Sequence, residues 1–221
     1  MKVAVIIPAY NAGGTLGNLL AEAVGWVDLC DVMVVNDGSD DATAAIMERS
    51  PVISLAHVAN CGKGRALRTG FAHALSLGYD AVITMDADGQ HDPKYIPSMI
   101  DIMDAGHWDI IVGSRRNEFG RMSFARFLSN SITTVVVSLL AGQKIEDSQC
   151  GYRLIRREVL EAIVLETDGY QMESELLIKA GRRGFTIGQV PIDIRSSATS
   201  HIRHLTDTWK FMVMALKSLW L

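Results

Sequence analysis

Short apolar runs alternate with helix-like segments along the first half of the chain. The runs cover residues 3–7, 32–35, 52–56, 81–85 and 110–112, and they are rich in β-branched residues. Nearly continuous apolar runs of this length are typical of strands buried on both faces of a sheet. Helical spacing or helix-start signals mark residues 15–24, 41–48, 63–77 and 93–105. The alternation predicts an α/β fold, with a mostly parallel, right-handed, Rossmann-like sheet and helices on both faces.

The pattern changes in the second half of the chain. A long amphipathic stretch at residues 122–140 precedes a short loop, a helix near residues 172–182 and a strand near residues 187–190. A basic loop and a C-terminal helix follow. Because 221 residues fit one large domain and no low-complexity linker interrupts them, we expect a single domain over residues 1–221.

Composition narrows the class of protein. The net charge of -4 argues against a general nucleic-acid binder, so no nucleic acid partner is expected. The three cysteines are far apart and odd in number, which favours free thiols and a cytoplasmic location. The N-terminal apolar run is too short for a signal peptide. The longest apolar stretches fall short of the roughly 20 residues that cross a bilayer.

Polar residues follow the predicted strands, at the edge where open α/β sheets bind ligands. They occupy residues 8–14, 36–41, 86–91 and 113–115. In an extended segment, Asp86 and Asp88 would project to the same side, and Gln90 with them. Such oxygen ligands suit Mg²⁺ or Mn²⁺, completed by substrate phosphates. The alternative is that the acidic pair only begins a loop or caps a helix.

Two other segments suggest nucleotide binding. Asp37 could accept hydrogen bonds from a base or a ribose, although residues 36–38 could also be only a turn. The glycines and cations of residues 60–65, with Gly62 and Lys63 among them, suit a phosphate at a helix N-terminus. That loop could equally be only a glycine-rich helix start. Neither a Walker loop nor a dinucleotide fingerprint is present, which weakens an oxidoreductase interpretation.

Taken together, these motifs resemble the family 2 glycosyltransferases of the GT-A fold. The matching segments are residues 7–11 (IPAYN), 35–41 (VNDGSDD), 60–64 (NCGKG), 85–91 (MDADGQH) and 113–115 (GSR). Residues 126–129, 147–153 and 175–192 look more narrowly like the dolichyl-phosphate mannosyltransferase and polyprenyl-phosphate glycosyltransferase branch. The similarity extends over roughly residues 3–204. It implies a nucleotide-sugar-binding half at residues 1–115 and an acceptor half at residues 116–221.

The resemblance implies donor contacts from Pro8, Tyr10, Asn11 and Asp37, metal contacts from Asp86, Asp88 and Gln90, and phosphate contacts from Arg115, Arg126 and Arg195. Together with the arguments from the residues themselves, it leads to the following sets. The metal ligands would be Asp86, Asp88 and Gln90. The donor-binding residues would be Pro8, Tyr10, Asn11, Asp37, Gly62, Lys63, Asp86 and Ala87. The acceptor-phosphate residues would be Arg126, Arg153, Arg195, Ser200, His201 and Arg203. The catalytic set would be Asp88, Arg115 and Glu175.

Two departures from the family pattern bear on specificity. Ala12 stands where the family usually has an acidic residue, which removes a carboxylate from the nucleotide pocket. In the loop at residues 195–201, His201 replaces a lysine, so a fixed charge becomes a titratable imidazole. Arg203 could then assist in binding the acceptor phosphate.

The nature of the acceptor decides whether a general base is needed. A sugar hydroxyl usually needs one, whereas a lipid phosphate arrives anionic and needs mainly positioning and charge neutralisation. Glu173 and Glu175 are the candidate bases. They point about 200° apart on a helix, so at most one faces the site, and we favour Glu175.

Residues 122–140 and 206–221 each combine an apolar face with a polar face. An apolar, aromatic face with lysines alongside is what an interfacial membrane helix needs, which predicts peripheral contact with the cytosolic membrane face. The alternative is that the apolar stripes pack on the sheet or on a second subunit, which leaves a homo-oligomer open.

The sequence therefore predicts metal-dependent hexose transfer from a GDP- or UDP-sugar to a polyprenyl phosphate, with inversion as the family implies. One alternative is a soluble family 2 transferase that acts on a glycan, a protein or a small hydroxyl acceptor. A non-catalytic sugar-nucleotide-binding protein is the other.

Overall fold

The computed structural model describes residues 1–115 and 124–195, except for the side chains of residues 124–126. The strands are β1 (Val3–Ala9), β2 (Val32–Asn36), β3 (Ile53–Ala56), β4 (Ala81–Thr84), β5 (Ile110–Ser114), β6 (Arg153–Arg156) and β7 (Ile187–Pro191). The helices are α1 (Leu16–Ala23), α2 (Thr43–Glu48), α3 (Lys63–Ser76), α4 (Ile96–Gly106), α5 (Phe124–Ala141), α6 (Arg157–Ala162) and α7 (Gln171–Arg182). Short 3₁₀ turns, η1 (Leu29–Asp31) and η2 (Pro93–Tyr95), precede β2 and α4.

The strands form one seven-stranded sheet in the order β3-β2-β1-β4-β6-β5-β7. β6 runs antiparallel to both of its neighbours, and every other pairing is parallel. The expected α/β fold with a mostly parallel sheet is confirmed. β6 and α6 lie where only a loop was expected. The four-residue strand has just two apolar residues between two arginines, too little for a recognisable strand pattern.

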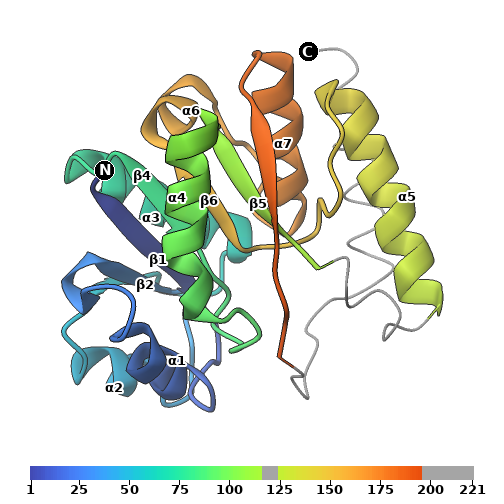
Figure 1. Cartoon of the computed structure of the whole chain (residues 1–221). Coiled ribbons are helices and arrows are strands. Elements are labelled where there is room, and N and C mark those ends of the chain that lie inside the picture. Colours follow the sequence, from blue (N-terminus) through green and yellow to red (C-terminus); the bar gives the residue numbers. More distant parts are fainter. Residues whose placement is uncertain (116–123, 196–221) are drawn as a thin grey trace.

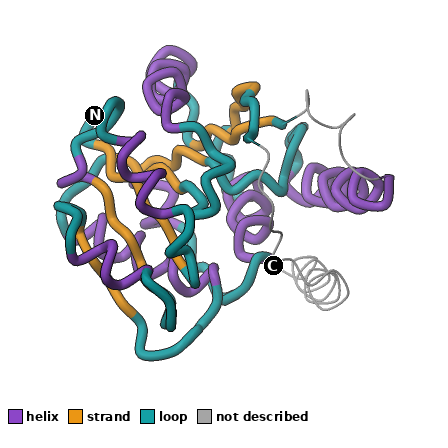
Figure 2. The backbone as a smooth tube through the Cα atoms, turned by 90° about the horizontal axis from the view of Figure 1, so that it is seen from below, coloured by secondary structure: helices purple, strands orange, loops and turns teal. Residues whose placement is uncertain are grey.

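Helices cover the sheet on both faces (Figure 1). α4 crosses the front of the sheet in that view, and α1 and α2 lie below it. On the other face α3 packs on β1 and β2, and α7 packs on α3. Figure 2 shows the strands sandwiched between helices when the molecule is seen from below. Every residue of β2 and β5 is buried, which explains their nearly continuous apolar sequences.

Close contact between α3 and β1 depends on a glycine. A Cβ on Gly70 would lie 2.5 Å from Cγ2 of Ile6, so only glycine allows the helix to approach the strand this closely. That contact holds the middle of α3 against β1. Lys63, at the start of the helix, then lies 2.6 Å from Asp86 in the loop after β4.

α5 lies at the edge of the molecule and packs mainly on α7 (Figure 1). Val137 and Ala141 are buried, whereas an outward stripe of Leu128, Ile132, Val135 and Leu139 is exposed. The helix expected at residues 122–140 is thus present. No helix in the described parts of the chain is long and apolar enough to cross a membrane.

Candidate functional site

The carboxyl ends of β1, β2, β4 and β5 lie at the same edge of the sheet, because these strands share one direction. The loops that follow them carry the metal-ligand candidates Asp86, Asp88 and Gln90, and the donor-binding candidates Tyr10, Asn11, Asp37 and Ala87. This is the edge at which open α/β sheets bind ligands.

The loops after β1 and β2 are held together by hydrogen bonds. The Asn11 N–H donates to Oγ of Ser39 (2.9 Å), and the Asp40 N–H donates to Oδ1 of Asn11 (3.1 Å). Asn11 has a φ of 50°, a left-handed conformation that asparagine tolerates better than most residues. The side-chain oxygen of Asn11 therefore has a structural role in joining the two loops. Neighbouring Tyr10 is half exposed, so its ring is open to a ligand.

Ala12, the departure from the family pattern, is buried beside the start of α2. Its N–H donates to Oγ1 of Thr43 (2.9 Å). The next residue, Gly13, donates to Oδ2 of Asp41 (2.7 Å), and a Cβ there would lie 2.8 Å from the same oxygen. The loop is thus closely packed around Ala12.

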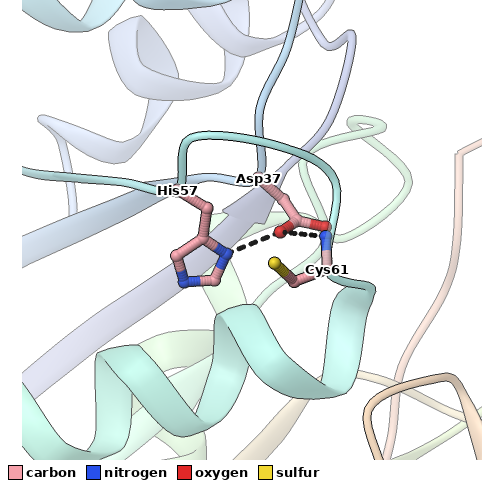
Figure 3. Close-up of side chains that lie close together, drawn as sticks. All are labelled: Asp37, His57 and Cys61. Atoms are coloured by element: carbon pink, nitrogen blue, oxygen red, sulfur yellow. Dashed lines mark hydrogen bonds and ion pairs between the residues drawn. The ribbon is translucent and has the colours of Figure 1, made fainter.

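Asp37 anchors the glycine-rich loop (Figure 3). Its Oδ1 accepts the Cys61 N–H (3.0 Å) and lies 2.6 Å from Nδ1 of His57, while Oδ2 accepts the Gly62 N–H (2.8 Å). A carboxylate offers about four acceptor positions, so these three contacts leave about one for a nucleotide.

Gly62 has a different role from the one that the sequence suggested. Its N–H is engaged by Asp37, and its φ is 99°. A Cβ on Gly62 would lie 2.5 Å from the Asp168 carbonyl oxygen, and one on Gly64 would lie 2.8 Å from backbone atoms of residues 167–169. The glycines thus accommodate the chain before α7. Because the Gly62 N–H already donates to Asp37, it is not free in this structure to donate to a phosphate.

Lys63 joins two carboxylates across the site. Its Nζ lies 2.6 Å from Oδ1 of Asp86 and 3.1 Å from Oε1 of Glu173. Burial opposes the ammonium charge, but the two carboxylates outweigh it and raise the pKa of Lys63. Burial likewise opposes ionisation of Asp86, yet the Lys63 ammonium lowers the pKa of Asp86 to about 2. Asp86 is therefore an anion at neutral pH.

Glu173, and not Glu175, faces this site. Oε1 and Oε2 of Glu175 accept the N–H groups of Glu166 (2.9 Å) and Thr167 (3.0 Å), and Lys179 lies 2.7 Å away. Glu175 thus holds the loop before α7, and the preference for it as the base is not supported. As expected from helix geometry, only one of the two glutamates faces the site, but it is Glu173 and not Glu175.

The loop after β4 turns instead of continuing as a strand. β4 ends at Thr84, Ala87 and Asp88 form a turn, and Gly89 has a φ of 74°. The extended conformation that was expected to align Asp86 with Asp88 is therefore wrong. Oδ1 of Asp88 accepts the Gln90 N–H (3.0 Å), and Asp88 is partly exposed. Behind the loop, Nδ1 of buried His91 accepts the Asp86 N–H (3.1 Å), and its ring stacks on Tyr152.

The side chains of Asp86, Asp88 and Gln90 fit a hard divalent cation. Two carboxylates and an amide are oxygen ligands of the kind that Mg²⁺ and Mn²⁺ prefer. Asp86 is ionised, and the ammonium of Lys63 beside it shows that the site accommodates positive charge.

Arg115 is held by a partner that the sequence did not indicate. Its Nε donates to Oδ2 of Asp147 (2.6 Å) and its Nη2 donates to Oδ1 (2.9 Å), and both residues are buried. Burial opposes both charges, but the ion pair raises the pKa of Arg115 and lowers that of Asp147. The two residues are 32 positions apart, so no local pattern reveals the pair.

The candidate acceptor residues have different surroundings. Arg153 is buried and donates to the carbonyl oxygens of Ser148, Cys150 and Glu173, so its guanidinium stabilises the chain around β6 and is not available to an acceptor phosphate. Arg195 lies beside the loop after β4, where its N–H donates to the Gln90 carbonyl oxygen and its guanidinium pairs with Glu22 and Asp92. The Arg126 side chain, Ser200, His201, Arg203 and the segment 206–221 lie outside the described residues.

Comparison with known proteins identifies relatives that match most of the chain. Residues 4–164 match the model of the family described as glycosyl transferase family 2. The chain is 32% identical over 203 residues to the polyprenol monophosphomannose synthase of Mycolicibacterium smegmatis, with 86% of this chain and 76% of that one covered. It is also 32% identical over 210 residues to the UDP-N-acetylglucosamine–dolichyl-phosphate N-acetylglucosaminyltransferase of Methanococcus voltae, with 85% and 83% covered.

A solved structure shares the fold. The glucosyl-3-phosphoglycerate synthase of Mycobacterium tuberculosis, solved with Mn²⁺, UDP and glucosyl-3-phosphoglycerate, superposes with a TM-score of 0.78 at 20% identity. The match covers 98% of this chain and 79% of that one. At this level of identity, the similarity shows that the chain has the fold of the GT-A glycosyltransferases.

Proposed function

The chain belongs to glycosyl transferase family 2, and from that membership we propose that it transfers a hexose from a nucleotide-diphosphate sugar to a polyprenyl phosphate. The observation that carries the donor side is the Asp86 carboxylate in the loop after β4, which lies 2.6 Å from the Lys63 ammonium and shares that loop with Asp88 and Gln90. The acceptor side is supported by relatives above 30% identity whose names specify polyprenol and dolichyl phosphate.

Asp86, Asp88 and Gln90 are the proposed ligands of Mg²⁺ or Mn²⁺. When bound, the metal supplies charge that stabilises the departing nucleotide diphosphate. Lys63 contributes a second, permanent positive charge next to Asp86. Arg115 is held rigidly by Asp147, which also offsets its charge, so we propose that it positions the loop after β5 and that Lys63 and the metal supply the net positive charge.

The nucleotide is proposed to lie along the loops after β1 and β2. Pro8, Tyr10 and Asn11 would line it, with the remaining acceptor position of Asp37 available to a base or ribose. Ala87 belongs to the same edge, since its carbonyl oxygen accepts the hydroxyl of Thr15 in the loop before α1 (2.6 Å).

On the acceptor side, Arg195 is the described cation that remains a candidate. An acceptor phosphate would have to displace Glu22 and Asp92 from its guanidinium. Arg126, Ser200, His201 and Arg203 complete the proposal. A phosphate acceptor attacks as an anion, so the proposal requires no general base.

The decisive experiment is a donor-by-acceptor matrix. GDP-mannose, UDP-glucose and UDP-N-acetylglucosamine are each combined with a polyprenyl phosphate or with soluble glycan and hydroxyl acceptors, in Mn²⁺ or in a chelator. The proposal expects metal-dependent incorporation of sugar into an organic-extractable product. Transfer only to a soluble acceptor would refute the lipid acceptor, and donor binding without any transfer would indicate a non-catalytic protein.

A matched pair of variants tests the metal role. Asp88→Asn is expected to lower turnover by at least about tenfold and to weaken its metal dependence, because a ligand carboxylate is lost. Asp101→Asn, in which an exposed carboxylate of α4 is neutralised, serves as the control. Unchanged turnover and metal dependence in Asp88→Asn would refute the assignment.

A further inference from the structure

A second group of metal-binding side chains lies at the end of β2. Asp37 lies in the turn after β2, and His57 and Cys61 both lie in the loop that joins β3 to α3. A carboxylate oxygen, a ring nitrogen and a sulfur from these residues all lie within 4.8 Å of one another (Figure 3). We propose that these three residues bind a zinc-class divalent ion at a site separate from that of Asp86 and Asp88.

The ligand atoms lie near the spacing that such an ion requires, with the Cys61 sulfur within 4.8 Å of the other two, so that it has to approach them by about 1 Å at most. Bonds of about 2.0 to 2.3 Å in a tetrahedral site place ligand atoms roughly 3.3 to 3.7 Å apart. Nδ1 of His57 is now 2.6 Å from Oδ1 of Asp37, a hydrogen-bond distance. The pair therefore has to open by about 1 Å or less, which a small rotation of the imidazole or carboxylate provides.

Contacts around the trio already orient the ligand atoms. Nε2 of His57 lies 2.9 Å from Oγ1 of Thr69 on α3, which directs Nδ1 toward Asp37. The N–H groups of Cys61 and Gly62 hold the Asp37 carboxylate. Outer contacts of this kind are typical of metal-binding histidines and carboxylates. These contacts thus hold the ligand atoms of His57 and Asp37 in place.

An ion can reach the site from solvent. Asp37 is buried and His57 is partly buried, whereas Cys61 is exposed. Binding would replace the proton between His57 and Asp37 and the weak hydrogen bond from the Cys61 thiol to the Ala59 carbonyl oxygen (3.3 Å). Cys61 would release its thiol proton, whereas His57 would bind through Nδ1 as the neutral tautomer that carries its proton on Nε2, beside Oγ1 of Thr69. Three protein ligands leave a fourth position for water.

Ligand chemistry separates this site from the one after β4. Thiolate and imidazole favour Zn²⁺ and its neighbours in the transition series, whereas carboxylate and amide oxygens favour Mg²⁺ and Mn²⁺. An excess of Mg²⁺ therefore leaves the trio open to a softer ion. Cobalt(II) is a useful probe, because it takes the same ligands as Zn²⁺ and absorbs when it is bound by a thiolate.

Occupation of the site has a consequence for transfer, and this step rests on the proposed function. Asp37 is a proposed donor-binding residue, and an ion on its Oδ1 would compete with the nucleotide. Zn²⁺ is thus expected to raise the apparent KM for the donor in the presence of excess Mg²⁺.

The test is a cobalt titration of the full chain in excess Mg²⁺. We expect a thiolate-to-cobalt absorption band that saturates at one ion per chain. Cys61→Ser should abolish the band, and His57→Gln should weaken binding by about tenfold or more. Cys30→Ser, which removes the other exposed cysteine, should retain the band.

Two results would overturn the site: a wild-type protein without the band, or a band that survives in Cys61→Ser. His57→Gln keeps the thiol and provides an independent test if Cys61→Ser fails to fold. Because the spectrum needs no catalysis, the site can stand if the transferase proposal fails. Wild-type protein that binds cobalt but whose donor KM is insensitive to Zn²⁺ would overturn only the competition with donor.

Discussion

At the scale of single residues, Lys63 is the centre of the candidate site. Its ammonium forms ion pairs with Asp86, a proposed metal ligand, and with Glu173, which is not one of the proposed ligands. A Cβ on Gly151 would lie 3.0 Å from Nζ of Lys63 and 2.9 Å from an oxygen of each carboxylate. The ion-pair network therefore occupies space that only glycine at position 151 leaves open.

Glu173→Gln is expected to weaken binding of the catalytic metal by about tenfold, within the range seen for outer contacts of metal ligands. With Glu173 neutral, the charge of Lys63 is directed to Asp86 alone and competes more strongly with the metal. The measurement is the Mn²⁺ concentration that gives half-maximal transfer, compared with Glu158→Gln on α6. An unchanged Mn²⁺ requirement would contradict this role for Glu173.

Glu175→Gln is expected to lower stability by about 1 to 3 kcal/mol at neutral pH, because buried N–H donors lose a charged acceptor. Hydrogen bonds from Thr167 and Lys179 outweigh burial and hold the pKa of Glu175 below its ordinary 4.5. The difference in unfolding free energy between wild type and Glu175→Gln is therefore fully present above pH 4.5, and it shrinks as the pH falls through the lowered pKa of Glu175.

Urea unfolding at neutral and acidic pH measures that gap. Glu161→Gln is the matched control, since Glu161 forms an exposed pair with Arg157 and should change stability little at either pH. A Glu175→Gln gap that grows on acidification would contradict the argument.

At the scale of elements, α3 begins where it does because of the chain before α7. Gly62 and Gly64 lie directly against the backbone of residues 167–169, and the Arg65 N–H donates to the Asp168 carbonyl oxygen (3.1 Å). Segments about 100 residues apart thus position the loop that carries Cys61 and Lys63. A glycine-rich loop before a helix, which resembles a phosphate site in sequence, is here also a packing surface.

Gly64→Ala is expected to destabilise the protein by about 1 to 3 kcal/mol, because its Cβ would lie 2.8 Å from three backbone atoms that cannot rotate away. Gly17→Ala on α1 is the control. Nothing lies within 4 Å of the added Cβ there, so stability should rise by up to about 1 kcal/mol. Thermal unfolding measures the stability of both variants. Equal changes in stability would show that helix propensity, and not the contact with residues 167–169, determines the effect of Gly64→Ala.

At the scale of the whole molecule, the apolar stripe of α5 is an exposed surface, within the described residues, that could contact a lipid. Leu128, Ile132, Val135 and Leu139 are exposed on one side of the helix, and residues 127–143 contain no charged side chain. An apolar face of this kind inserts into the boundary of headgroups and acyl chains.

If the stripe contacts a membrane, replacing Ile132 and Val135 with serine is expected to lower cosedimentation with polyprenyl-phosphate-containing vesicles severalfold, because apolar area is lost from the exposed side of α5. Val24→Ser, at an exposed apolar position just after α1, is the control. If the double variant sediments like wild type but changes from an oligomer to a monomer, the stripe is a subunit interface instead.

The architecture was largely accessible from the pattern of apolar residues. Strands buried on both faces leave continuous apolar runs, and the boundaries expected for β1 to β5 and α3 differ from the structure by one or two residues. The family could also be predicted from the sequence, because each of its motifs is a short, continuous segment at the end of a strand. Local order therefore determined the fold and the class of enzyme.

Contacts between distant segments were decided only by the tertiary structure. The pairs Arg115–Asp147 and Lys63–Glu173, the burial of Arg153 and the choice of Glu173 over Glu175 all depend on where β6 and α7 lie. β6 is short and antiparallel, and its place between β4 and β5 has no periodic signal. A one-dimensional pattern records which residue types follow a strand, but a side chain's partner depends on the packing of elements far apart in the chain.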